Sequence, residues 1–90
     1  ARGGAPEGRG AVTPADAALL THLRAHEAAT RAAAERLRAA LDALPRGAYA
    51  PDLRDASLRA TAEHATALAC LAGQRRHCAR AATQRHQPTA

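Results

Sequence analysis

The residues of this 90-residue chain that are best suited to bind a metal are its histidines and cysteines. His22 and His26 are four residues apart, so on a helix they share a face one turn apart. Cys70, His77 and Cys78 follow near the other end of the chain. Zn²⁺ and copper accept imidazole and thiolate ligands. In a chain folded back on itself these five residues would gather at the open end, as a candidate zinc or copper site.

The spacing of the same residues also argues against a single bound ion. Cys70 and Cys78 are about 12 Å apart along a continuous helix, which also speaks against a disulfide between them. His77 and Cys78 are adjacent, so their side chains diverge by about 100°. The chain has no Cys-x-x-Cys or His-Glu-x-x-His motif. We therefore expect no cofactor, with zinc or copper binding as the alternative.

A second candidate site is the basic end of the chain. Residues 1–66 carry nine arginines and eight acidic residues, whereas residues 67–90 carry no acidic residue and four arginines. Such a segment could bind nucleic acid or another anionic surface. However, cations near a helix C-terminus also stabilise the helix through its macrodipole. In addition, no aromatic residues lie between these arginines to stack on bases. Nucleic acid is thus a less favoured partner. The candidate anion-binding residues are Arg75, Arg76, Arg80 and Arg85.

Catalysis has little support in the residue types. Ser57 is the only serine, and it lacks the sharp turn that exposes a nucleophile. His64 and Glu63 are neighbours, so on a helix they point in different directions, and we expect His64 to be solvated. No glycine-rich phosphate loop follows a strand. The sequence predicts that the chain is not an enzyme.

Two long helices are predicted to position these residues. The first covers residues 14–44 and begins with Thr13 as N-cap, Pro14 at the first helical position and Asp16 completing a capping box. The second covers residues 52–83, with Asp52 as its N-cap. Alanine, leucine, arginine and glutamate dominate both, and all four favour helices.

The segments around the helices are rich in glycine and proline. Residues 45–51 (PRGAYAP) form the predicted turn, in which Tyr49 covers the end of the hairpin or anchors a partner. Residues 1–12 are expected to be a flexible lead-in, and residues 84–90 a frayed tail. The hairpin proper is therefore predicted to span residues 13–83.

Each predicted helix carries a stripe of residues at alternating three- and four-residue spacing, which is typical of a helix–helix interface. In the first helix the stripe is apolar at both ends and polar in the middle. Gly73 interrupts the second helix and indicates a break, a kink or a close helix approach. The first stripe is Leu20, Leu23, Glu27, Thr30, Ala34, Leu37, Leu41 and Leu44; the second is Leu58, Thr61, Ala65, Leu68, Ala72, Ala79 and Ala82.

Helices of matched length joined by a short loop predict an all-α fold, a two-helix antiparallel hairpin that resembles a coiled coil. With the turn near residue 48, His22 would lie opposite Arg75 and Glu27 opposite Cys70. The chain has 28 alanines and only 10 leucines, so its own core is small. We therefore predict a non-enzymatic interaction module that forms a homo-oligomer, such as a four-helix bundle of two hairpins, or packs against a partner helix.

The composition carries limited information on origin and compartment. Alanine, arginine, glycine and proline have GC-rich codons, so a high-GC genome accounts for much of the bias. Charges break every apolar run, so no membrane span is expected. The compartment is left open, with the cytoplasm favoured. In shape and composition the hairpin resembles the small substrates of type VII secretion systems of high-GC Gram-positive bacteria, but its turn lacks their Trp-x-Gly motif.

Overall fold

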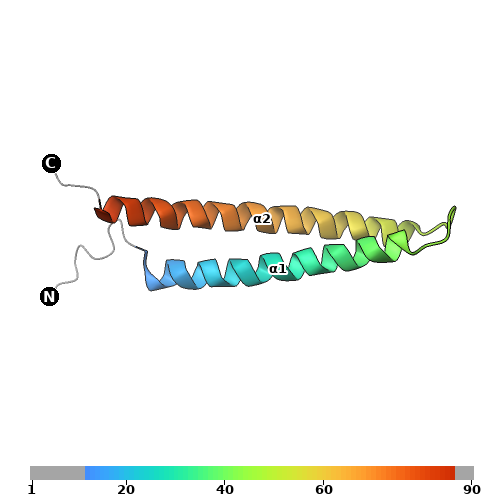
Figure 1. The fold of residues 1–90 in the computed structure, drawn as a ribbon, viewed down its shortest axis with the longest axis horizontal. Coiled ribbons are helices and arrows are strands. Elements are labelled where there is room, and N and C mark those ends of the chain that lie inside the picture. The colour runs from blue at the N-terminus through green and yellow to red at the C-terminus, as the bar shows by residue number, and fades with distance from the viewer. Residues whose placement is uncertain (1–11, 87–90) are drawn as a thin grey trace.

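The computed structural model describes residues 12–86, which form two α-helices packed side by side in opposite directions (Figure 1). Helix α1 spans Pro14–Asp42 and helix α2 spans Pro51–His86. The turn lies at one end of the hairpin and the two chain ends at the other. The predicted flexible lead-in, apart from Val12, and residues 87–90 of the predicted tail lie outside the described residues. The all-α antiparallel hairpin is confirmed.

Helix α1 begins with the capping box that the sequence predicts. The backbone N–H of Asp16 donates to Oγ1 of Thr13 at 3.0 Å, and the backbone N–H of Thr13 donates to Oδ2 of Asp16 at 3.4 Å. These bonds satisfy two of the amide groups that a helix N-terminus leaves without partners. Pro14 occupies the first turn, where its missing N–H costs nothing.

The connection between the helices is a tight turn stabilised by backbone hydrogen bonds. Helix α1 ends at Asp42, two residues before the predicted end. The N–H of Ala48 donates to the carbonyl of Pro45 at 3.0 Å, and Gly47 has a φ of 81°. This left-handed backbone at the third position is typical of a type II turn and favours glycine.

Helix α2 is longer than predicted at both ends. It begins at Pro51, and the carbonyl of Ala50 accepts the first helical hydrogen bond, from the N–H of Arg54 at 3.0 Å. Asp52 is therefore in the first turn and is not the N-cap that the sequence predicts. The helix continues through Gly73 without interruption (Figure 1), so neither a break nor a kink occurs there. A Cβ added at this glycine would meet only a side-chain atom of Arg76, at 3.8 Å, which also excludes a close helix approach.

The core between the helices is small, and α2 supplies its most buried residues. Helix α1 contributes no fully buried side chain, although all eight residues of its predicted stripe are partly buried. In α2 the buried apolar residues are three alanines and one leucine, and Ser57 is buried with them. The buried apolar residues are Ala60, Ala67, Leu71 and Ala81.

The face that α2 turns toward α1 lies one residue away from the predicted stripe. Leu58 and Leu68, which were expected in the interface with α1, are 70% and 46% exposed. We call the residues of α2 that face α1 the inner stripe. The inner stripe does not include Arg75. The predicted stripe would have placed the charge of Arg75 in the interface, between Ala72 and Ala79, where a buried charge is unfavourable. The inner stripe is Leu53, Ser57, Ala60, His64, Ala67, Leu71, Gln74, Cys78 and Ala81, all buried or partly buried.

Two further observations concern the surface of the hairpin. Tyr49 is 91% exposed, so it does not cover the end of the hairpin. Between residues 12 and 86, no helix is apolar enough over a sufficient length to cross a membrane.

Candidate functional site

The middle of the hairpin contains a hydrogen-bonded pair of titratable side chains. Nε2 of His64 donates to Oε2 of Glu27 at 2.8 Å, and both side chains are mostly buried between the helices. Arg31, one turn along α1, places its Nε 3.8 Å from the same oxygen. Both partners lie on the stripes that face each other, so the pair fixes the register of the two helices. His64 is therefore not the solvated residue that the sequence suggests.

The hydrogen bond from His64 holds the pKa of the Glu27 carboxyl below its ordinary value. Partial burial opposes this shift, whereas the positive charges of Arg31 and Arg75 add to it. The carboxylate thus remains ionised in a cleft where a lone charge would be unfavourable.

A second polar cross-link lies near the open end. Nε2 of Gln74 donates to the backbone carbonyl of Asp16 at 3.1 Å, and Nε2 of His77 is 3.2 Å from Oδ2 of the same residue. Burial raises the pKa of the Asp16 carboxyl, but hydrogen bonds from His77 and Thr13 outweigh it, and the pKa lies below its ordinary value. Asp16 therefore both completes the N-terminal cap of α1 and links α1 to α2.

These cross-links correct the predicted register of the hairpin. Glu27 lies opposite His64 and not opposite Cys70, a displacement of six residues along α2. The predicted cluster of five ligands at the open end was based on that register, which is wrong. Within residues 12–86, no three side chains of histidine, cysteine, aspartate or glutamate gather where they could hold one metal ion.

The individual candidate ligands occupy different environments. His22 and His26 are exposed on α1 with their rings parallel and 6.4 Å apart. Cys70 is exposed, whereas Cys78 lies on the inner stripe with its Sγ 3.8 Å from Nε2 of Gln74. His77 is engaged with Asp16. Only the two α1 histidines keep the paired arrangement that the sequence predicts.

The candidate anion-binding arginines lie on the last third of α2. Arg75, Arg76 and Arg80 are exposed, and in the described part of the chain none of them forms a salt bridge. Arg85 belongs to α2, but its side chain lies outside the description. This end of the helix therefore presents an uncompensated positive surface.

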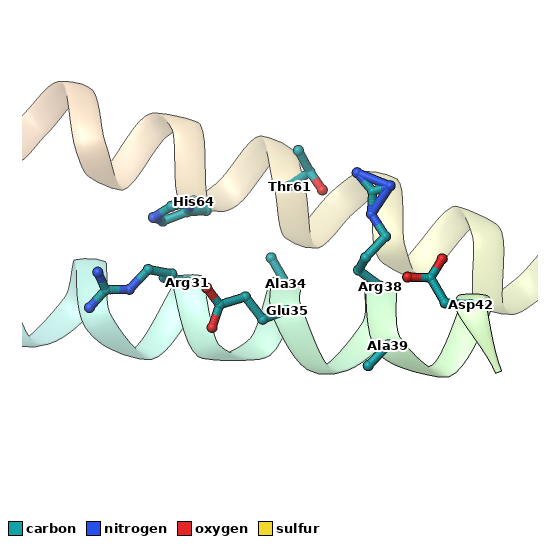
Figure 2. A pocket seen from close by; sticks show the side chains of 8 residues that line it. All are labelled: Arg31, Ala34, Glu35, Arg38, Ala39, Asp42, Thr61 and His64. Atoms are coloured by element: carbon teal, nitrogen blue, oxygen red, sulfur yellow. The ribbon is translucent and has the colours of Figure 1, made fainter.

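A groove of about 440 Å³ lies along one side of the hairpin (Figure 2). Its walls combine cationic and anionic side chains of α1 with two polar side chains of α2. Arg38 extends from α1 toward α2, beside the carboxylate of Asp42 (Figure 2). The groove is open to solvent and holds charges of both signs, so it offers no enclosed site for a small ligand. It is lined by Arg31, Ala34, Glu35, Arg38, Ala39, Asp42, Thr61 and His64.

The most distinctive surface is the exposed face of α2 next to this groove. The residues predicted to face α1 lie here, each one position after a member of the inner stripe. This outer stripe includes Leu58 and Leu68, two of the most exposed large apolar side chains in residues 12–86; Leu19 on α1 is 44% exposed. The two leucines are ten residues apart, about 15 Å along the helix, with Thr61 and Ala65 between them. The outer stripe is Leu58, Thr61, Ala65, Leu68 and Ala72.

Comparison of the chain with known protein families, with curated proteins and with solved structures found no match in any of the three.

Proposed function

We propose that this chain is a non-enzymatic helical association module that acts by pairing with a second copy of itself. The observation that carries the proposal is the distribution of its leucines. Leu58 and Leu68 are exposed on α2, while the buried apolar residues are three alanines and the single Leu71. Full burial of a fully exposed leucine stabilises a complex by about 1.5–3 kcal/mol, and Leu58 and Leu68, at 70% and 46% exposed, can still contribute part of that, whereas alanines contribute much less.

The small core supports the same proposal. A chain of this size buries a low fraction of its surface when it folds alone, and conformational entropy offsets most of the gain. Pairing of two hairpins into a four-helix bundle would cover the exposed leucines and add apolar contacts to each hairpin. Association and folding stability would then be coupled, as in many small helical proteins.

Sedimentation velocity and circular dichroism over a range of micromolar concentrations test this proposal. We expect the sedimentation coefficient and the thermal midpoint both to rise with concentration, because association stabilises the folded state. A folded monomer with a cooperative transition that does not depend on concentration would refute self-association. Dilution of the same sample back to the starting concentration is the control for irreversible aggregation.

The other two sequence-based hypotheses have less structural support. Within residues 12–86 no three of the candidate metal ligands gather at one point, and His22 and His26 are the two that lie with their rings stacked. The arginines of α2 form a positive surface, but no aromatic side chain accompanies them there. Both hypotheses stay predictions.

A further inference from the structure

The position of the outer stripe on α2 suits a second helix. Leu58, Thr61 and Ala65 each follow a residue of the inner stripe by one position, and one position rotates a side chain by about 100° around a helix. In a square four-helix bundle each helix has two neighbours at about 90° to each other. The inner stripe already contacts α1, so the outer stripe points to where the second neighbour would lie.

The sequence of the outer stripe is nearly symmetric about residue 63. Leu58 and Leu68 lie five positions before and after it, and Thr61 and Ala65 lie two positions before and after it. When a surface pairs with its own copy across a two-fold axis, each residue faces its counterpart on the other side of the axis. An axis near residue 63 would therefore set leucine against leucine, twice.

The charges of α2 favour an antiparallel over a parallel pairing. Before the axis, α2 carries Asp52 and Asp55 with two arginines; Glu63 lies on the axis itself, and no acidic residue follows it. Its second half carries the exposed arginines, and neither these nor the three acidic residues form salt bridges within the described chain. With an axis near residue 63, position 52 of one copy is level with position 74 of the other, so antiparallel pairing brings Asp52 beside Arg75 and Arg76, while parallel pairing sets each arginine beside its own copy.

We propose that two copies pair through their α2 helices, antiparallel, with Leu58 of each copy facing Leu68 of the second copy. This inference rests on the proposed self-association and names its surface. Arg31 and Arg38 of α1, which line the groove with Thr61, lie beside the contact and form part of its charged rim. The exposed leucines thus become the buried centre of an interface whose edge is polar.

Charge substitutions at the two leucines test the surface. The single variants Leu58→Glu and Leu68→Arg each remove two apolar contacts per dimer, one on each side of the axis. At about tenfold per contact, the dimer dissociation constant should rise at least a hundredfold. The double variant sets glutamate against arginine twice, and its dissociation constant should return to within about tenfold of the original value. Leu19→Glu is the matched control, because Leu19 is an exposed leucine of α1, and it should leave the dissociation constant unchanged.

Sedimentation velocity on all five proteins, with circular dichroism to show that each is helical, separates the outcomes. Loss in both single variants and recovery in the double variant support the antiparallel α2 contact. Loss without recovery overturns the antiparallel pairing, since a parallel contact would set glutamate against glutamate. An original chain that dimerises, with single variants that dimerise equally well, overturns this surface and leaves self-association standing. An original chain that stays monomeric overturns both proposals.

Discussion

The inner and outer stripes of α2 lie one residue apart and have opposite characters. The inner stripe packs Ser57, His64 and several alanines against α1, and Leu71 is its most buried leucine. The outer stripe leaves Leu58 and Leu68 at the surface. The inner stripe also contains Leu53, so each stripe carries two leucines, and the burial of large apolar side chains does not by itself decide which face packs against α1. Other forces must therefore contribute to the choice of the face that contacts α1.

Two such forces can be identified in the inner stripe. Small side chains let the helix axes approach closely, toward the short end of the usual 8–10 Å. The hydrogen bond between Glu27 and His64 requires that both residues face each other. If α2 were rotated by one position, His64 would leave Glu27, and a carboxylate between the helices would lose its partner. The hairpin therefore keeps its polar pair and leaves Leu58 and Leu68 exposed.

The largest expected effect is on the free energy of unfolding, which should depend on the inner stripe and much less on the outer stripe. Leu71→Ala removes the buried leucine of the inner stripe, which is 4% exposed, and should lower the free energy of unfolding by about 2–5 kcal/mol. Leu58→Ala removes the same atoms from the outer stripe and should change it by less than about 0.5 kcal/mol. Urea denaturation followed by circular dichroism at low protein concentration measures both. Equal losses in the two variants would mean that the stripes do not differ in this way.

How much of this could be predicted from the sequence differs between the helices. In α1 four leucines mark the stripe, and the rotation of the helix is unambiguous. In α2 alanines occur at so many positions that two neighbouring stripes fit the three-and-four spacing. The inner stripe passes through His64 and Gln74, whereas the outer stripe meets Arg75 when it is extended. The unbroken inner repeat was the signal that could have identified it, because interfaces tolerate histidine and glutamine better than a buried guanidinium.

The candidate metal cluster depended on a quantity that the sequence determines poorly. In an antiparallel hairpin, a residue of one helix lies opposite the residue that is equally far beyond the centre of the turn. An error of one residue in that centre therefore displaces every opposite residue by two. Helix α1 ends at Asp42 and α2 begins at Pro51, so the turn is centred earlier than residue 48. Turn chemistry such as the left-handed Gly47 shows that a turn is present but does not give the register. The pairing of Glu27 with His64 could be recognised only once the helices were placed side by side.

An intermediate effect concerns pH and the pair that His64 of the inner stripe forms with Glu27 of α1. The folded pKa of Glu27 lies below its ordinary value, so its stabilising contribution is present above the ordinary carboxyl range. The contribution is lost as the pH falls through the lower folded pKa. We expect the thermal midpoint of the original chain to fall on acidification, and that of Glu27→Gln to fall less steeply. Asp16, whose pKa is also lowered, supplies the slope that remains.

The matched control for this titration is Glu63→Gln, which changes an exposed carboxylate that forms no salt bridge in the described chain. Its midpoint should follow the same pH dependence as the original chain, measured by circular dichroism between neutral pH and the acid transition. If Glu63→Gln flattened the curve as much as Glu27→Gln, the pH dependence would come from the overall charge and not from the pair with His64.

The smallest effect concerns Gly73, which belongs to neither stripe. The helix is continuous there, and an added Cβ would make only an ordinary contact with the side chain of Arg76. Gly73→Ala should therefore raise the free energy of unfolding by about 0.5–1 kcal/mol, since glycine loses more backbone entropy than alanine when a helix forms. Gly47→Ala is the opposite case, because a φ of 81° is unfavourable for alanine, and it should lower the free energy by about 1 kcal/mol. Urea denaturation measures both, and a loss of stability in Gly73→Ala would show that α2 packs against something at this position.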